Sequence, residues 1–164
     1  AEATEALRSL LRTMDLRDRR AESPDDHSDI PRIVVFIDEL ADLVMTGGQD
    51  TTQALTRLAQ RGRQAGIHLV AATQHPAAAL LGSLLRANFP LRLVGRVASA
   101  QDAHVASGRA ATDAHLLHGR GDFLAISAAD EPIRFQAATI DPKEIRHHVA
   151  QLADQSLALP MPET

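Results

Sequence analysis

Aromatic residues are scarce in this sequence, which contains four Phe and neither Tyr nor Trp. Hydrophobic residues nevertheless make up 45% of its 164 positions, so a core of ordinary size must be built from Leu, Val, Ile and Ala. Cysteine is absent, which excludes a disulfide framework and thiolate metal ligands and suits a reducing cytoplasm.

Long apolar runs are missing as well. The longest, such as the run from Ile33 to Ile37, are far too short to cross a bilayer. The first residues, Ala-Glu-Ala-Thr-Glu, have neither the basic nor the apolar region of a signal peptide. We therefore expect a cytoplasmic segment without membrane contact. Because it opens on Ala1 instead of Met, we expect a fragment, and any membrane anchor of its parent would lie outside these residues.

Lysine is nearly absent, since sixteen of the seventeen basic residues are Arg and Lys143 is the only lysine. The net charge of −4 argues mildly against nucleic acid, but the charges are unevenly distributed. Residues 55–127 carry eight Arg against three Asp, whereas the segments on either side are acidic. A locally basic middle suits a surface that faces phosphates, and it is equally compatible with arginines on solvated helices.

Hydrophobic periodicity and turn residues divide the chain into alternating helices and strands. An amphipathic helix is predicted over 2–20, followed by a polar loop to residue 31 with two prolines. A basic helix is predicted over 51–65, and Gly66 is expected to end it. The other predicted helices cover 39–45, 80–87, 99–106 and 110–117, with a Gly-containing loop at 46–50 and a last helix opened by Asp141. The predicted strands cover 32–37, 67–73, 89–97, 122–127 and 132–138.

This alternation is typical of an α/β domain with a mainly parallel sheet flanked by helices, closed here by a C-terminal β-hairpin. We expect one domain over residues 1–153, followed by a flexible tail at 154–164. Its parts are a helix and polar loop at 1–31, a central region at 32–138 and a C-terminal helix at 139–153. In such sheets chemistry gathers at the carboxyl ends of the strands.

Two acids, Asp38 and Glu39, follow the first apolar strand, in the pattern known as Walker B. There Asp38 can hold a water bound to Mg²⁺, and the metal can bridge the β- and γ-phosphates of a nucleotide. Glu39 can accept a proton from the attacking water or orient it. The alternative is structural, with Asp38 capping the following turn and Glu39 lying on its first turn.

Thr73 and Gln74 end the second buried strand, one helix further along the chain. An amide both donates and accepts hydrogen bonds, so Gln74 can contact a γ-phosphate or the lytic water and sense its loss. This pair is a weak signal alone, and its spacing from the acids strengthens it. The two strand ends together predict a nucleotide site formed by Asp38, Glu39, Thr73 and Gln74.

Five ordered blocks resemble the motor domain of the FtsK/SpoIIIE family of DNA translocases. They are Asp38-Glu-Leu-Ala-Asp-Leu, Ala54-Leu-Thr-Arg-Leu-Ala-Gln-Arg-Gly-Arg-Gln-Ala-Gly-Ile-His-Leu, Ala72-Thr-Gln-His-Pro, Leu84-Leu-Arg-Ala-Asn-Phe-Pro-Leu-Arg-Leu and Leu116-Leu-His-Gly-Arg-Gly-Asp-Phe-Leu. The first helix also resembles the one before Walker B in that family. One departure is His75, because the family usually has Arg after the sensor Gln.

The resemblance implies part of a RecA-like P-loop ATPase core. It also implies a homo-oligomeric, hexameric ring that uses ATP and Mg²⁺ to pump double-stranded DNA. ATP lies between neighbouring subunits in such rings, and an arginine of one subunit reaches the γ-phosphate held by the next. Arg92 is the leading candidate and Arg96 the next, with a structural strand role as the alternative. Arg57, Arg61 and Arg63 of the basic helix are candidates for facing DNA.

The phosphate-binding loop, Gly-x-x-x-x-Gly-Lys-Ser/Thr, does not occur in these residues. That loop cradles the polyphosphate with backbone N–H groups and a lysine. We therefore expect the chain alone to be inactive and its parent to be an ATPase and DNA translocase of the chromosome-partition or cell-division type. Two alternatives stay open: a catalytically inactive RecA-like remnant that acts as an assembly module, and a secretion or conjugation ATPase of the same superfamily.

Overall fold

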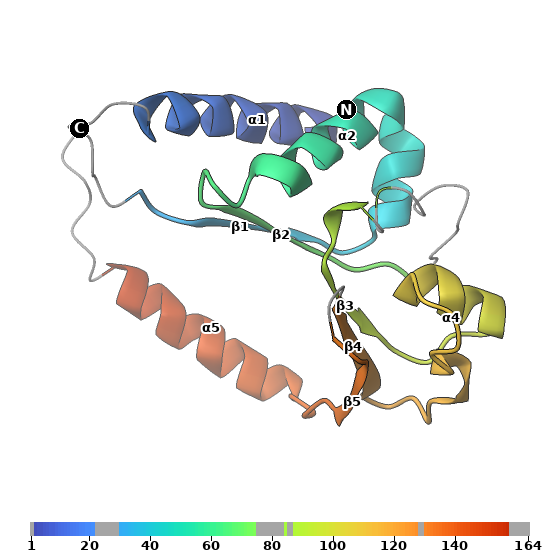
Figure 1. Ribbon diagram of the computed structural model, residues 1–164. Coiled ribbons are helices and arrows are strands. Elements are labelled where there is room, and N and C mark those ends of the chain that lie inside the picture. Colours follow the sequence, from blue (N-terminus) through green and yellow to red (C-terminus); the bar gives the residue numbers. More distant parts are fainter. Residues whose placement is uncertain (1, 22–29, 75–83, 85–86, 128–129, 158–164) are drawn as a thin grey trace.

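The structure, a computed structural model, describes residues 2–21, 30–74, 84, 87–127 and 130–157 (Figure 1). Helices and strands alternate along these residues, which confirms the α/β class. The helices are α1 (Glu2–Ala21), α2 (Leu40–Arg61), α4 (Ala100–Ser107) and α5 (Pro142–Leu157), with a short 3₁₀ turn, η1, at Ala114–Leu116; the strands are β1 (Ile33–Ile37), β2 (Ile67–Ala71), β3 (Leu91–Val94), β4 (Asp122–Ser127) and β5 (Ile133–Gln136).

β1 and β2 pair in parallel, with Ile33 opposite Ile67 and Ile37 opposite Ala71. Both strands therefore begin at one edge of the sheet and end at the other. The pairing continues past the strands, because the Ala72 N–H donates to the Ile37 carbonyl (2.8 Å). The Ala72 carbonyl in turn accepts a hydrogen bond from the N–H that opens α2 (2.8 Å). These bonds hold the residues after the two strands next to each other.

α1 and α2 cover one face of this parallel pair (Figure 1). Apolar residues three to four positions apart give each helix an apolar stripe. Met14 of α1 and Leu55 and Leu58 of α2 are almost completely buried where these stripes meet the sheet. Burial of one such side chain contributes roughly 1.5–3 kcal/mol before conformational entropy is counted. The other face is open, since Phe36 and Val34 are 76% and 50% exposed.

A glycine pair turns the loop predicted at 46–50 into a kink within one helix. Gly48 has a φ of 64° and a ψ of −154°, which glycine adopts readily, and helical geometry continues on both sides. A Cβ at Gly47 would lie 2.0 Å from the hydroxyl oxygen of the buried Thr51, so glycine is needed there too. The helix ends at Arg61, earlier than predicted, and Gly66 closes the following turn with a φ of 71°.

A three-stranded antiparallel sheet, in the order β3-β4-β5, forms the second half of the fold. The predicted C-terminal hairpin is confirmed, as Phe123 of β4 pairs with Phe135 of β5 and their rings stack with centroids 5.9 Å apart. The strand predicted over 89–97 is shorter and pairs with β4. A second apolar cluster, which includes Val94, Ala103 and Leu124, packs α4 against this sheet.

Two of the predicted helices differ from the structure or cannot be compared with it. The segment 110–117 forms only the η1 turn instead of a helix. The helix predicted over 80–87 falls mostly outside the described residues. Within the described part of the chain, no helix has the length and apolar character that a membrane span requires.

The last helix begins as predicted. The Asp141 carboxylate accepts hydrogen bonds from the N–H groups of Lys143 (2.6 Å) and Glu144 (2.9 Å), the arrangement of an N-cap. The helix continues to Leu157, past the expected start of the flexible tail, and the rest of that tail (158–164) lies outside the described residues. Residues 142–153 of α5 are all exposed, so this helix contributes little to either apolar cluster.

Asp122 fixes the start of β4 to β5. Its carboxylate accepts two hydrogen bonds from the Arg134 guanidinium (2.9 and 2.7 Å) and one from the His118 backbone N–H (2.7 Å). These donors favour the charged carboxylate, with the Arg134 hydrogen bond as the largest cause. They lower the pKa of Asp122 from 3.8 to about 2.

Folding stability should depend on pH through this carboxylate. A depressed pKa contributes stability above the unfolded-chain value of about 4, and the contribution is lost as the pH falls toward 2. Arg134→Gln removes the main cause, so its loss of unfolding free energy should be full at pH 7 and shrink below pH 4. Urea denaturation at several pH values measures this, with Arg146→Gln on the exposed α5 as the control. A loss that is constant from pH 7 to pH 2 would contradict the assignment.

Candidate functional site at the strand ends

The carboxylate of Glu39 joins the ends of β1 and β2. Glu39 is the N-cap of α2, and its Oε1 accepts a hydrogen bond from the Ala41 N–H (3.2 Å). The same oxygen accepts the hydroxyl of Thr73, while Oε2 accepts the backbone N–H of Gln74 (2.8 Å). Three of the four residues predicted for the nucleotide site are thus in direct contact.

Asp38 precedes this cluster and is exposed to solvent. Among the residues that the structure describes, no hydrogen bond or ion pair engages its carboxylate, and no three acidic or histidine side chains gather as metal ligands. A full protein cage is not needed for Mg²⁺, which keeps several waters and binds through one or two carboxylates. An exposed carboxylate at a strand end therefore fits the predicted contact through water.

The two acids differ from the structural alternative that the sequence suggested, in which Asp38 caps the turn and Glu39 lies on its first turn. Glu39 caps the helix, whereas the sequence analysis assigned that alternative role to Asp38. The sequence held a signal for it, since an acid directly before an apolar helix is a usual N-cap position. The direct contact of Glu39 with Thr73 and Gln74 was not predicted, because it depends on the pairing of β1 with β2. The bonded residues lie 34 and 35 positions apart in the sequence.

The guanidinium of Arg92 packs inside its own chain. Its Nε donates to the Phe89 carbonyl (3.2 Å), and its Nη1 donates to the Ser107 carbonyl at the C-terminus of α4 (2.5 Å). Gly108 caps that helix, and a Cβ there would lie 2.1 Å from Arg92 Nη1. A cation at a helix C-terminus is favoured by the helix dipole. These contacts suit the structural alternative; Arg96, by contrast, is exposed.

The basic face of α2 is partly neutralised by α1. Arg57 lies 3.4 Å from the Asp15 carboxylate, and Arg61 donates to Asp18 at 2.7 Å. Such surface pairs contribute roughly 0–1 kcal/mol each. Arg63, the third candidate for facing DNA, is exposed in the turn after α2. The sequence alone did not reveal these pairs, because the partners are more than 40 positions apart.

Solved structures resemble this fold closely. The pCW3 conjugation coupling protein TcpA, in a monomer form with ATPγS, superposes with a TM-score of 0.78 at 24% identity, over 93% of this chain and 49% of its own. The cytoplasmic domain of the type VII secretion ATPase EccC from Thermomonospora curvata gives a TM-score of 0.74 at 20% identity, over 92% of this chain and 20% of its own. The fold is that of a RecA-like P-loop ATPase.

The sequence comparisons are more specific. The profile of the FtsK/SpoIIIE family matches residues 13–78. The DNA translocase FtsK of Sporosarcina ureae is 41% identical over 133 residues, and DNA translocase FtsK 1 of Neisseria meningitidis is 39% identical over 137 residues. These alignments cover 80% and 84% of this chain, which spans 17% of the length of each relative. The chain is a segment of an FtsK/SpoIIIE-type motor domain.

Glu39→Ala should lower the free energy of unfolding by about 1 kcal/mol, because it removes the N-cap of α2 and the acceptor of the Gln74 N–H. Asp38→Ala, at an exposed side chain, should change it by less than about 0.5 kcal/mol. Chemical denaturation followed by circular dichroism measures both variants. Equal losses from the two substitutions would contradict the different roles assigned to the neighbouring acids.

Proposed function

We propose that this chain supplies the Walker B half of the ATP site in a motor that translocates double-stranded DNA. The observation that carries the proposal is the contact of Glu39 with Thr73 and Gln74 at the ends of two parallel strands. The similarity to FtsK proteins supports the translocase class. The phosphate-binding loop is not among these residues, so the nucleotide site requires a further segment that carries it.

Each side chain at the strand ends has a separate task in this proposal. Bound Mg²⁺ would neutralise negative charge on the phosphate oxygens of ATP, and Asp38 would hold one of its waters. Glu39 would orient the attacking water and accept its proton. The side-chain amide of Gln74 would contact the γ-phosphate or that water. Because Gln74 also donates its backbone N–H to Glu39, a displacement of one residue would be transmitted to the other.

We further propose that the complete protein works as a homo-oligomeric, hexameric ring around DNA, with one arginine acting on the ATP of the neighbouring subunit. Arg92 can do this only if its guanidinium leaves the carbonyls of Phe89 and Ser107. Arg63 and Arg96 are exposed and need no such rearrangement. The geometry therefore supports these two over Arg92 as the arginine that acts in trans.

A secretion or conjugation ATPase is the second candidate function. It is favoured by one observation, the likeness to a conjugation coupling protein and a type VII secretion ATPase over more than nine-tenths of the chain. Identities of 24% and 20% support the fold alone. The higher identity to DNA translocases favours the first proposal, with double-stranded DNA as the substrate. The third candidate is an inactive remnant. It differs from the other two because the complete protein would then show no ATP turnover.

In the complete motor, Glu39→Gln should leave ATP bound but slow hydrolysis by about 10²-fold or more, because an amide cannot accept the water's proton. Asp38→Asn should instead weaken Mg²⁺-dependent binding of ATP, because it removes charge that faces the metal. Nucleotide binding and turnover, measured across Mg²⁺ concentrations, separate the two effects. The 164-residue chain alone should show no turnover. Near-normal hydrolysis by the Glu39→Gln motor would contradict the role of Glu39.

Arg92→Ala distinguishes a structural arginine from one that acts in trans. Since Arg92 serves the C-terminus of α4, we expect a lower melting temperature and nearly unchanged hydrolysis per folded ring. Removal of an arginine that reaches the neighbour's γ-phosphate would instead slow hydrolysis by about 10³-fold with ATP binding intact. Thermal unfolding and ATPase assays on the same preparation decide between these outcomes. Arg146→Gln, on the exposed face of α5, controls for the loss of one positive charge.

A further inference from the structure

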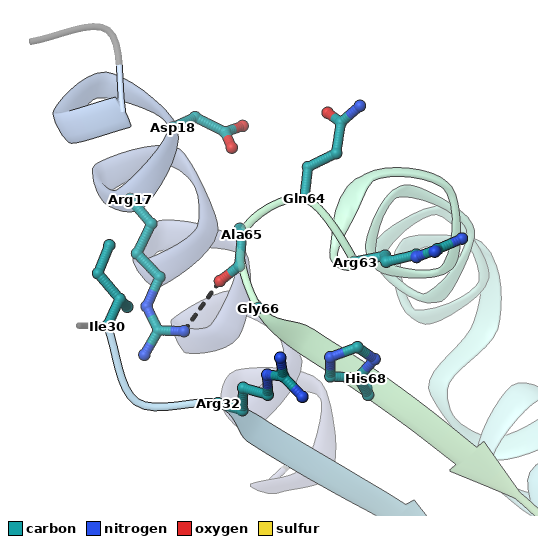
Figure 2. Close-up of a pocket in the computed structure, with 9 residues that line it drawn as sticks. All are labelled: Arg17, Asp18, Ile30, Arg32, Arg63, Gln64, Ala65, Gly66 and His68. Carbon is teal, nitrogen blue, oxygen red and sulfur yellow. Dashed lines mark hydrogen bonds between the residues drawn. The ribbon is translucent and has the colours of Figure 1, made fainter. Parts of the chain in front are cut away.

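A cavity of about 520 Å³ lies at the edge of the parallel sheet where β1 and β2 begin (Figure 2). Four basic side chains contribute to its wall: Arg17 from α1, Arg32 just before β1, Arg63 from the turn after α2, and His68 in β2. Because the strands are parallel, this edge is opposite the one that carries Glu39. The cavity is therefore separate from the candidate nucleotide site.

Hydrogen bonds hold the Arg17 side chain and the backbone next to Arg32 beside the turn at Gly66. The Arg17 Nη1 donates to the Ala65 carbonyl (2.9 Å), which fixes its guanidinium across the Gly66 turn. A Cβ at Gly66 would meet that nitrogen at 3.5 Å, an ordinary van der Waals contact. Arg32 precedes Ile33, whose N–H donates to the Gly66 carbonyl (2.9 Å). Two arginines from distant parts of the sequence are thus held beside one turn.

The side chains converge on one space. Figure 2 shows the guanidinium of Arg32 next to the ring of His68 below Gly66, with the guanidinium of Arg17 to their left, where it is bonded to Ala65. The side chain of Asp18 points away from them in the same view. Arg63 lies at the margin of the cavity. All three side chains can donate hydrogen bonds, and all three line the same cavity.

No carboxylate neutralises this group among the described residues. Asp18 is the acidic residue among the described residues that line the cavity. Its carboxylate accepts a hydrogen bond from Arg61 (2.7 Å). Neither Arg17 nor Arg32 has an ion pair within the part of the chain that the structure describes. Like charges held close together are unfavourable, and an anion between them removes that repulsion.

We propose that Arg17, Arg32 and His68 bind a phosphate group. An arginine fork matches the oxygens of a phosphate, and several charge-assisted hydrogen bonds to one oxyanion give the site selectivity over a simple halide. The phosphate can belong to the backbone of duplex DNA or to a nucleotide, since both present the same oxygens. This inference stands apart from the proposed function, because it uses the opposite edge of the sheet and requires no ATP hydrolysis.

The test is a titration of the 164-residue chain, labelled with ¹⁵N, with inorganic phosphate at constant ionic strength. The amide resonance of Gly66 and the resonances of His68 should shift and saturate with phosphate, and equal chloride should not reproduce the shifts. Arg32→Gln should weaken phosphate binding about tenfold, the loss of one charge-assisted hydrogen bond. Arg32 is exposed and its side chain has no hydrogen bond or ion pair within the described residues, so this variant should fold. Arg146→Gln, which removes the same charge from α5, should bind phosphate like the wild type.

Competition identifies the source of the phosphate. If the group belongs to DNA, a short duplex should displace inorganic phosphate at Gly66, and Arg32→Gln should weaken the duplex as well. If it belongs to a nucleotide, ATP without Mg²⁺ should displace phosphate and the duplex should not. Shifts at Gly66 that never saturate, or that are the same in Arg32→Gln and Arg146→Gln, would overturn the proposal.

Discussion

The parallel pairing of β1 with β2 is the constraint on which the rest of this structure depends. Parallel strands end at the same edge, and the register places Ile37 beside Ala71. The residues that follow are brought together although more than 30 positions separate them. The carboxylate of Glu39 then joins the ends, because it caps α2 and also accepts hydrogen bonds from Thr73 and Gln74. The same few atoms start a helix and define the candidate catalytic site.

The two edges of the sheet have opposite chemical character. The edge where the strands end carries Asp38 and Glu39, and the edge where they begin carries Arg17 and Arg32. α1 and α2 give both edges a rigid support, since their apolar stripes fill one face of the sheet. The other face remains open, with Phe36 largely exposed. Parallel sheets are usually covered on both faces, which agrees with a chain that is one segment of a larger motor domain.

The sequence predicted the features that arise from local patterns. Short β-branched runs marked β1 and β2, and alternation with helices marked the α/β class. The kink at Gly48 was missed because a Gly pair among polar residues also describes a loop, and only the close approach of Gly47 to buried Thr51 distinguishes the two. Pairing was the harder part: the ion pair of Arg61 with Asp18 and the contacts of Arg92 join segments whose proximity no local pattern reveals.

Hydrogen exchange at the Gln74 amide tests most directly whether Glu39 joins the two strand ends. In the wild-type chain this amide should exchange slowly, as the neighbouring Ala72 amide should, because each donates to a fixed acceptor. In Glu39→Ala, the Gln74 amide should exchange much faster while Ala72, bonded to the Ile37 carbonyl, stays protected. A Gln74 amide that exchanges in the wild type at the rate of an unstructured peptide would contradict the account.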